Sequence, residues 1–454
     1  MKAHIRTYGC QMNERDSENI AANFVENGWQ ITDTEADADV IVVNTCSVRE
    51  QAESKAIGKL GHLLTYRKSA GKTLPVIGTT GCMAQNRGAD IAKTLPDIDF
   101  VVGPRKTHLV AKIAAEIFAE KSRAGVKSAD FSPYIDIADD PSGHLKISKH
   151  FPLSKSAGVC AFVSIMQGCQ MNCSYCIVPK VRGVMRSRPT EDVVDEVRRL
   201  ADGGVREITL LGQVANAFGF EKRNPDGVSE FVRLLEKIDA IDAVKRIRFT
   251  SPHPSFFRDD LINAYGTLPK LCEYVHLPLQ SGSDTILKAM NRPYSAEKFL
   301  QIAQKLRARS PDMSISTDVI VGYPRETEED FQKTVDAFKA ADFDMAFVFK
   351  YSPRAGTKSA ELPDDVPEEV KEERNQRLLA VLEEQSMRFH NNMVGRIYEV
   401  LVEGRAKRGE GMFMGRTRNH RKCIFAADES FVGKLVNVKI TSATVTALAA
   451  EIVD

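Results

Sequence analysis

Three cysteines stand close together near the middle of the chain, at a spacing that suits metal chemistry. Cys169, Cys173 and Cys176 fall within MQGCQMNCSYC and form a CxxxCxxC pattern. A closed zinc site takes four protein ligands, and an iron–sulfur cube normally takes four thiolates. A loop with three cysteines therefore leaves one iron of a 4Fe–4S cluster open to a ligand that is not protein.

Two other interpretations of the three cysteines remain open. They are either incidental thiols or part of a zinc knuckle that borrows Cys160, nine positions upstream of Cys169, as its fourth ligand. Cys160 falls in the apolar run VCAFVSIM, which predicts a strand. A cysteine inside that strand is a poor candidate for a ligand in the loop that follows.

The composition indicates a globular protein of several domains. A length of 454 residues predicts two to four domains, and 43% hydrophobic with 27% charged residues is ordinary for a chain with buried cores. The first residues, MKAHIRTYGC, lack the apolar run of a signal peptide, and we find no apolar stretch long enough to span a membrane. We expect a cytoplasmic protein without membrane contact, in which nine cysteines are metal ligands or reactive thiols rather than disulfides.

The first third of the chain predicts a parallel-sheet α/β domain, residues 1–120. Apolar runs at 4–9, 39–45 and 74–80 are each followed by a helical pattern. The next segment, 121–155, is polar and aperiodic, and we interpret it as a linker.

The rest of the chain predicts two further domains. Between residues 156 and 390, six strand–helix units favour a partial (β/α)6 barrel with reactive groups at the carboxyl ends of its strands. A charged helix at 367–392 leads to residues 391–454, where Val- and Ile-rich runs separated by Gly predict a small all-β barrel.

Three more cysteines follow strands of the N-terminal domain. Cys10, Cys46 and Cys82 come after HIRTYG, VIVVNT and VIGTTG. Loops at the carboxyl ends of parallel strands line one edge of a sheet, so these thiols can converge. Spacing alone leaves two possibilities open: a metal site, and three unrelated buried cysteines.

The flanking motifs decide between these possibilities. TYGCQMNERDSE (7–18), NTCSVRE (44–50) and GCMAQ (81–85), together with the central CxxxCxxC loop, resemble the radical S-adenosylmethionine (SAM) methylthiotransferases over essentially the whole chain. The resemblance implies two 4Fe–4S clusters, one on Cys169, Cys173 and Cys176 and an auxiliary one on Cys10, Cys46 and Cys82. It also implies a C-terminal RNA-binding barrel of the TRAM type.

The same resemblance suggests which residues contact SAM. The motifs concerned are ADGGVREITLLGQ, TSPHP, HLPLQSGS and STDVIVGYPRET. Their candidate residues, with the tyrosine before the last cysteine, are Tyr175, Gly203, Gly204, Gln213, Ser251, Gln280, Ser316 and Asp318. For each one, a satisfied turn or strand cap is the competing interpretation. One segment departs from the family pattern, because LLGQVAN has Val214 and Ala215 where LLGQNVN is usual.

The implied reaction adds a methylthio group to RNA. One SAM would methylate a sulfur on the auxiliary cluster, and a second would yield a 5′-deoxyadenosyl radical that takes hydrogen from C2 of an adenine. YGCQMN and NTCSVRE are most similar to members that modify N6-isopentenyladenosine at position 37 of tRNA. Alternatives are threonylcarbamoyladenosine in tRNA, an aspartate of a ribosomal protein, or a non-enzymatic iron–sulfur protein that binds RNA.

These expectations also cover the partners. The substrate base must leave the anticodon-loop stack, which a single-stranded loop allows at modest cost. We further expect a monomer that depends on an electron donor and on a source of sulfur or clusters.

Two basic stretches are candidates for the RNA surface. Residues 404–422 carry seven Lys or Arg and one Glu, a local net of 7 − 1 = +6, and residues 179–189 (PKVRGVMRSRP) lie beside the central cysteines in sequence. The predicted phosphate-binding residues are Arg182, Arg405, Lys407, Arg416, Arg418 and Arg421. Solvated surface charge is the competing interpretation.

Overall fold

The structure is a computed structural model. It describes residues 1–47, 50–72, 74–124, 132–140, 146, 149–151, 153, 158–222 and 224–453. These residues form two compact units. Unit 1 consists of Met1–Ser154, Met166–Gln170 and Ile177–Arg188, and unit 2 of Lys155–Ile165, Met171–Cys176 and Pro189–Asp454.

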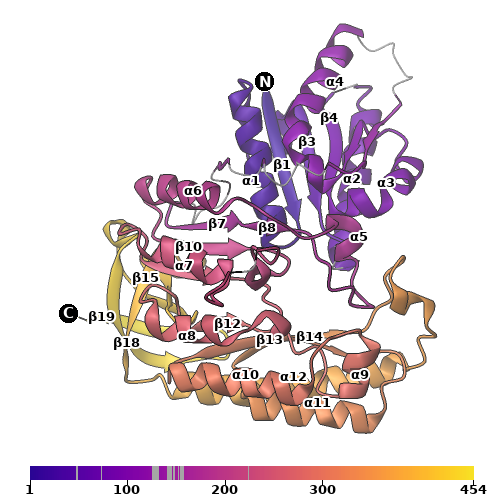
Figure 1. Cartoon of the computed structure of the whole chain (residues 1–454). Helices are drawn as coiled ribbons and strands as arrows, with labels where there is room; N and C mark the ends of the chain where they lie inside the picture. Colours follow the sequence, from indigo (N-terminus) through magenta and orange to yellow (C-terminus); the bar gives the residue numbers. More distant parts are fainter. Residues whose placement is uncertain are drawn as a thin grey trace. The chain divides into compact units, whose positions relative to one another are not determined.

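Unit 1 is built on a six-stranded parallel sheet with the order β2-β1-β3-β4-β5-β6 (Figure 1). Its strands are β1 (Lys2–Tyr8), β2 (Gln30–Ile31), β3 (Val40–Thr45), β4 (Val76–Gly81), β5 (Phe100–Val102) and β6 (Tyr134–Asp136). The longer helices are α1 (Gln11–Glu26), α2 (Glu50–Ser69), α3 (Cys82–Thr94) and α4 (Val110–Ala124). The predicted α/β domain is confirmed.

The alternation of side chains along β3 explains the two layers of helices. Val40 and Val42 pack into a core with α1 and α4, whereas Ile41 and Val43 pack into a second core with α2 and α3. Successive side chains of a strand point to opposite faces, so an uninterrupted apolar run such as VIVV has to be covered on both sides. Shorter elements of unit 1 are η1 (Glu35–Asp37), η2 (Pro104–Leu109), β8 (Met166–Gln167), α5 (Val178–Arg182) and β9 (Arg186–Ser187).

The predicted linker at 121–155 contains part of this domain. Helix α4 continues to Ala124, and β6 pairs in parallel with β5. Asp136 at the end of β6 forms an ion pair with Lys106. Three residues of sequence YID carry too little periodicity to predict a strand, which is why sequence reasoning missed it. Most of the remaining linker lies outside the described residues.

Unit 2 contains six parallel strands, as predicted. They form the sets β11-β10-β7 and β12-β13-β14, and a parallel bridge between Ile247 and Leu271 lies between the two sets. The strands are β7 (Cys160–Ser164), β10 (Glu207–Leu211), β11 (Arg246–Phe249), β12 (Tyr274–His276), β13 (Ser314–Val321) and β14 (Met345–Lys350).

The helices of unit 2 follow these strands and cover the sheet (Figure 1). They are α6 (Thr190–Asp202), α7 (Glu230–Asp239), α8 (Asp259–Thr267), α9 (Asp284–Ala289), α10 (Ala296–Arg309), α11 (Glu328–Ala341) and α12 (Glu368–Asn391). Short turns of 3-10 helix are η5 (Ala215–Ala217), η6 (Pro254–Phe256) and η7 (Lys358–Glu361). Helix α12 matches the predicted charged helix.

The C-terminal residues of unit 2 close into a five-stranded barrel with the order β15-β16-β17-β19-β18. Its strands are β15 (Ile397–Arg405), β16 (Met412–Thr417), β17 (Lys422–Ala426), β18 (Leu435–Ala443) and β19 (Leu448–Val453), with η8 (Glu429–Phe431) between β17 and β18. Inward-facing residues such as Val402, Phe413 and Val438 fill its interior. The predicted all-β barrel is confirmed.

Buried arginines dock this barrel on the parallel strands. Arg246 of β11 donates hydrogen bonds to the carbonyl oxygens of Arg416 and Glu399, at 2.5 and 3.0 Å. Arg248 donates to the carbonyl oxygens of Arg418 and Thr417, at 2.7 and 2.9 Å. The guanidinium groups satisfy main-chain acceptors that the contact would otherwise bury without partners.

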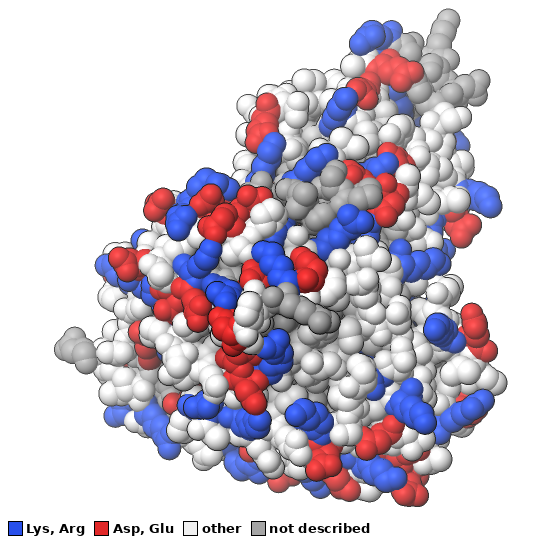
Figure 2. Space-filling view, viewed as in Figure 1, with Lys and Arg blue, Asp and Glu red and all other residues white. Residues whose placement is uncertain are grey.

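Charge on the molecular surface is mixed. Figure 2 shows Lys and Arg side chains interleaved with Asp and Glu over the face in view, in keeping with a net charge of +1. Among the described residues, no helix is long and apolar enough to cross a membrane.

Candidate active site

The three N-terminal cysteines lie at the carboxyl ends of three adjacent strands. Cys10 follows β1 and is the N-cap of α1, Cys46 follows β3, and Cys82 follows β4 as the first residue of α3. Because β1, β3 and β4 are parallel neighbours, the three residues share one edge of the sheet. We call them the N-terminal cysteine site. The shared edge agrees with the strand–helix pattern of the sequence, and a cluster held by the three thiols stays a prediction.

A buried pair of asparagines fixes the backbone beneath this site. Asn13 donates from Nδ2 to Oδ1 of Asn44 at 2.9 Å and to the carbonyl oxygen of Thr45 at 3.0 Å. Asn44 donates in return to the carbonyl oxygen of Asn13 at 2.8 Å and to Oγ of Ser17 at 2.9 Å. Both asparagines are fully buried. The network ties the loop that carries Cys10 to the loop that carries Cys46.

Gly81 allows the neighbouring loop to approach the same network. It has φ of +96°, and a Cβ atom there would lie 2.3 Å from the carbonyl oxygen of Thr45 and 2.5 Å from Oδ1 of Asn44. Only glycine fits this conformation and this space. Cys82 therefore enters the site directly from the end of β4.

The environment of the site favours a thiolate at Cys10. The pKa of Cys10 is lowered to about 6, mainly by a hydrogen bond with Cys46, with further contributions from Arg182 and from the backbone N–H groups of Met12 and Asn13. Backbone N–H groups at a helix start stabilise a thiolate. Burial raises the pKa of Cys82, and Arg182 opposes that rise.

The central cysteine loop, residues 169–176, is divided between the two units. In unit 1, the N–H of Cys169 donates to the carbonyl oxygen of Gly183 at 2.9 Å. In unit 2, Cys173 is buried, and Arg292 donates from Nη1 to its sulfur at 3.3 Å. Tyr175 packs against Ile286, Met290, Tyr323 and Tyr351.

Several hydrogen bonds attach this loop to the rest of unit 2. Oγ of Ser174 lies 2.9 Å from the hydroxyl of Tyr323, and its N–H donates to the carbonyl oxygen of Met290 at 3.0 Å. Arg292 also donates to the hydroxyl of Tyr294, which itself donates to the carbonyl oxygens of Pro278 and Leu279. Arg292 and Tyr294 thus link the loop to the segment after β12. Neither residue lies in a sequence motif that predicts a functional site.

Cys160 lies away from the loop. It is the first residue of β7, and it pairs in register with Glu207 at the start of β10. The central loop follows the other end of β7, so the strand separates Cys160 from it. The geometry gives no support to a zinc knuckle that includes Cys160.

Several of the predicted SAM contacts gather at the carboxyl ends of strands in unit 2. His276 at the end of β12 joins two of them, because its Nδ1 lies 2.9 Å from Oγ of Ser316 and its Nε2 lies 3.2 Å from Oδ2 of Asp318. The N–H of Gln280 donates to the carbonyl oxygen of Asp318 at 2.8 Å. The structure therefore brings Gln280, Ser316 and Asp318 together.

Backbone strain marks the same ends of the strands. Ser251 after β11 has φ of +54°, Gln280 after β12 has +68°, and Arg325 after β13 has +69°. Non-glycine residues adopt this conformation only where the surrounding structure enforces it, often at functional sites. Ser251 also accepts a hydrogen bond at its carbonyl oxygen from the N–H of Ala215, two residues after the candidate Gln213.

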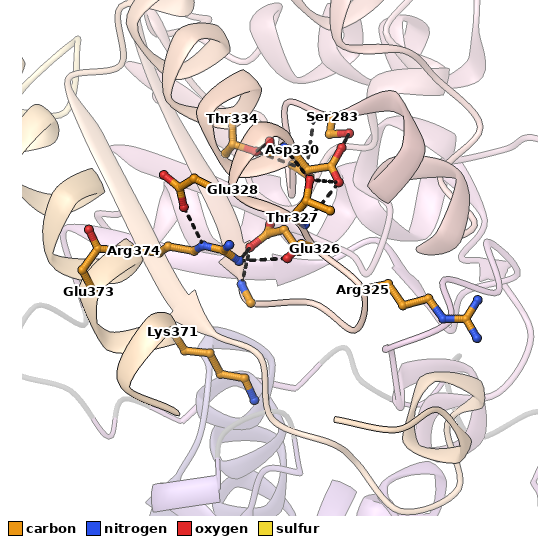
Figure 3. A network of polar contacts seen from close by, with 12 residues as sticks. Ser283, Arg325, Glu326, Thr327, Glu328, Asp330, Thr334, Lys371, Glu373 and Arg374 are labelled. Atoms are coloured by element: carbon orange, nitrogen blue, oxygen red, sulfur yellow. Dashed lines mark hydrogen bonds and ion pairs between the residues drawn. The ribbon is translucent and has the colours of Figure 1, made fainter. Parts of the chain in front are cut away.

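A polar network fixes the loop after β13 (Figure 3). Glu326 accepts from Arg374 at 2.9 Å, and Thr327 and Asp330 form a capping box at the start of α11. Asp330 also accepts from Ser283 at 2.6 Å, which ties the segment after β12 to α11. Arg325 extends away from this network and is exposed (Figure 3).

The structure places Gly203 and Gly204 apart from the other predicted SAM contacts. These residues end α6 and precede β10, so they lie at the amino end of that strand. A Cβ atom on Gly204 would lie 3.7 Å from the carbonyl oxygen of Gly158, which precedes β7. Gln213, Ser251 and Gln280 instead follow the carboxyl ends of β10, β11 and β12. The two glycines end helix α6. A glycine is suited to this place because Gly204 has a positive φ.

We expect unit 2 to lose stability in acid through two buried histidines. Burial and Arg292 lower the pKa of His253 to about 3, and burial with nearby arginines lowers the pKa of His420 well below its usual range. The unfolded chain binds protons on both side chains below pH of about 6.5, whereas the folded chain does not, so stability falls as pH falls. For His253 the loss should reach about 2 kcal/mol at pH of about 5.

Urea unfolding at neutral and acidic pH measures this effect. His420→Gln should reduce the pH dependence of the free energy of unfolding, and His253→Gln should do the same. An unchanged pH dependence in both variants would contradict the assignment.

Three family models and several curated proteins match this chain. The radical SAM superfamily model matches residues 163–338, the model of uncharacterized protein family UPF0004 matches residues 2–103, and the TRAM domain model matches residues 391–453. The tRNA-2-methylthio-N(6)-dimethylallyladenosine synthase of Opitutus terrae is 48% identical, over 99% of this chain and 97% of its own. The synthase of Methylacidiphilum infernorum is 49% identical, over 97% and 92%. The chain belongs to this synthase family.

A solved structure agrees in fold. The radical S-adenosylmethionine methyltransferase TsrM of Kitasatospora setae superposes with a TM-score of 0.56 at 14% identity, covering 77% of this chain and 72% of its own. The family membership confirms the resemblance that the motifs indicated.

The donor chemistry fits the clusters that the synthase family implies. Among the described residues, no three Cys, His, Asp or Glu side chains are drawn together around one point as the ligands of a single ion are. The fit rests instead on three thiols at adjacent strand ends, on the lowered pKa of Cys10, and on arginines that donate to the sulfurs of Cys82 and Cys173. Positive hydrogen-bond donors suit anionic iron–thiolate centres.

The predicted RNA-binding arginines have different environments. Arg421 is buried and forms an ion pair with Asp344 at 2.6 Å, and Arg418 forms one with Glu273 at 2.8 Å. Arg416 is paired with the buried Glu403. Arg405 and Lys407 are exposed. The sequence predicts one basic patch at residues 404–422. In the structure, Arg416, Arg418 and Arg421 make contacts inside unit 2, and Arg405 and Lys407 lie at the exposed β15–β16 turn.

Arg182, the sixth RNA candidate, is buried in unit 1. Its side chain is 2% exposed and lies against Asp16 and Cys82. The structure does not present it to a large ligand at the surface.

Proposed function

We propose that this chain is a tRNA methylthiotransferase that inserts a methylthio group at C2 of N6-dimethylallyladenosine, also called isopentenyladenosine, at position 37. The observation that carries the proposal is the pairing of two three-cysteine sites in one chain, within a family whose named members are synthases of the methylthio product. A tRNA substrate implies that the enzyme works in the cytoplasm.

Different residues of the chain would bind the two clusters and orient SAM. Cys169, Cys173 and Cys176 would hold one 4Fe–4S cluster, and Cys10, Cys46 and Cys82 would hold the auxiliary one. Together with SAM, such clusters supply radicals that remove hydrogen from an unactivated carbon, which acid–base groups cannot do. Ser316, Asp318 and Gln280 would orient SAM, because His276 and the backbone of β13 hold them close together.

We also propose the partners of this methylthiotransferase. The anticodon loop of tRNA would lie partly on the C-terminal barrel, and an external electron donor and a source of sulfur or clusters would serve a monomeric enzyme. The alternatives of threonylcarbamoyladenosine and of a ribosomal aspartate are distinct products, so one experiment separates them.

Mass spectrometry of tRNA nucleosides tests the proposal. In cells that lack the gene, 2-methylthio-N6-dimethylallyladenosine should vanish and N6-dimethylallyladenosine should accumulate, and the intact gene should restore both. Loss of the methylthio derivative of threonylcarbamoyladenosine instead would assign the other tRNA substrate. No change in either nucleoside would reject a tRNA substrate.

We expect the exposed turn between β15 and β16 to contribute to tRNA affinity. Arg405 is 68% exposed in its ion pair with Glu429, so a phosphate can replace that partner at little cost. Arg405→Ala with Lys407→Ala should weaken binding and reduce the slope of log K against log salt by about one to two. Binding is measured by titration of tRNA at several salt concentrations.

A matched pair of lysines provides the control. Lys305 and Lys333 are about half exposed and paired with Asp259 and Glu329, on helices away from the barrel turn. Lys305→Ala with Lys333→Ala should leave the salt dependence unchanged. Equal effects of the two double variants would remove the turn from the RNA surface.

A further inference from the structure

Arg182 lies directly against a ligand of the N-terminal cysteine site. Its Nε donates to the sulfur of Cys82 at 3.2 Å, and its Nη2 donates to Oδ2 of Asp16 at 2.7 Å. The side chains of Arg182 and Asp16 are 2% and 0% exposed. Helix α5, which carries Arg182, also packs Ile177 and Val181 against Cys82. The whole contact is internal to unit 1.

The arginine is held in place by groups other than the cysteine. Asp16, on α1, fixes the Nη2 side of the guanidinium, and Arg105 donates from Nε and Nη2 to the carbonyl oxygen of Arg182 at 3.1 and 2.8 Å. Burying an arginine costs free energy unless a carboxylate pairs with it. The pair with Asp16 meets that condition and leaves Nε directed at sulfur.

One nitrogen of the guanidinium has no acceptor. Nη1 of Arg182 is buried and has no hydrogen-bond partner among the described residues. A buried charged donor without an acceptor is costly in a folded protein. The sulfur atoms of a bound iron–sulfur cluster are acceptors of suitable charge for it.

We propose that Arg182 is a positioning residue of the auxiliary cluster, which holds Cys82 as a ligand and raises the reduction potential of the cluster through its positive hydrogen bonds to sulfur. This inference rests on the proposed function, which supplies the cluster. Groups that hydrogen-bond to metal ligands typically change metal affinity on the order of 10- to 100-fold. Hydrogen bonds to sulfur are also among the determinants of the potential of iron–sulfur clusters.

Lys180 provides a matched control for charge. It lies two residues before Arg182 on the same helix and is exposed. Lys180→Gln and Arg182→Gln remove the same charge from the same basic stretch. A role in RNA binding predicts effects of both on tRNA affinity, whereas the proposal predicts an effect of Arg182→Gln on the cluster alone.

The test uses the full chain with Cys169, Cys173 and Cys176 replaced by Ala, so that only the auxiliary cluster can form. After reconstitution with iron and sulfide, we expect Arg182→Gln to release iron to a chelator on the order of 10- to 100-fold faster. We also expect a lower midpoint potential in a redox titration followed by electron paramagnetic resonance. Lys180→Gln should match the parent in both measurements.

Two further variants guard against simple misfolding. Asp16→Asn with Arg182→Gln removes both charges and leaves neither one buried alone, and the proposal predicts the same loss of iron. Arg182→Lys keeps the positive charge but lacks the planar guanidinium group. This variant should restore the midpoint potential more fully than it restores the retention of iron.

The outcomes separate the two proposals. Unchanged iron release and potential in Arg182→Gln and in the double variant would overturn the role of Arg182. Failure of the parent to bind a cluster on Cys10, Cys46 and Cys82 would instead overturn the proposed function.

Discussion

Cys173→Ala should abolish the methylthio product and leave the N-terminal cysteine site able to hold iron. Cys173 is 9% exposed, and Arg292 donates to its sulfur at 3.3 Å. Without this thiolate the central loop keeps two cysteines, too few to hold a cluster that already lacks a fourth protein ligand. The radical chemistry belongs to the cofactor, so we expect no detectable product and roughly half of the iron.

Nucleoside analysis of tRNA and iron analysis of the reconstituted protein measure both effects. Cys272→Ala is the matched control, since Cys272 is also buried and its sulfur lies 3.9 Å from the carbonyl oxygen of Lys270, outside the two cysteine sites. That variant should keep the product and the iron. A Cys173→Ala enzyme that still forms product would reject the assignment of the central loop, and one that loses all iron would reject two independent sites.

The features that the sequence predicted correctly depend on short-range patterns. Cys10, Cys46 and Cys82 each follow an apolar run, and the parallel order of β1, β3 and β4 brings the ends of those runs together. A βα repeat permits few topologies, so local spacing was enough to predict a shared edge. The six strands of unit 2 follow from the same periodicity.

The features that the sequence did not predict depend on partners far along the chain. Arg182 looked like a surface charge because its neighbours in sequence are basic, yet its ion-pair partner Asp16 is 166 residues away. Arg421 likewise finds Asp344 from another domain. Composition reports the sign of a charge but not its partner, and burial of an ion pair leaves no periodic signal.

Asn13 and Asn44 show a different limit. Both stand inside the motifs YGCQMN and NTCSVRE, so they were in view, but their role is a reciprocal hydrogen bond between two loops. The motif pointed to the cysteines because thiols have obvious chemistry. Polar residues two or three positions from a cysteine in each of two motifs were the available signal of a supporting network.

Asp344→Ala should be among the most destabilising single substitutions in unit 2. Asp344 and Arg421 are 1% and 7% exposed in an ion pair of 2.6 Å, and Ser314 donates to the same carboxylate at 3.0 Å. Removing the carboxylate leaves the guanidinium of Arg421 buried without its counter-charge. Breaking one side of a buried pair costs about 3 to 5 kcal/mol, and we expect that loss in the free energy of unfolding from urea titration.

Two comparisons isolate the cause. Glu429→Ala breaks the pair with Arg405, whose members are 62% and 68% exposed, and should cost about 1 kcal/mol or less. Asp344→Leu with Arg421→Met removes both charges and should recover most of the stability, because apolar side chains replace a buried ion pair well. If the double variant were as unstable as Asp344→Ala, lost packing rather than an uncompensated charge would be the reason.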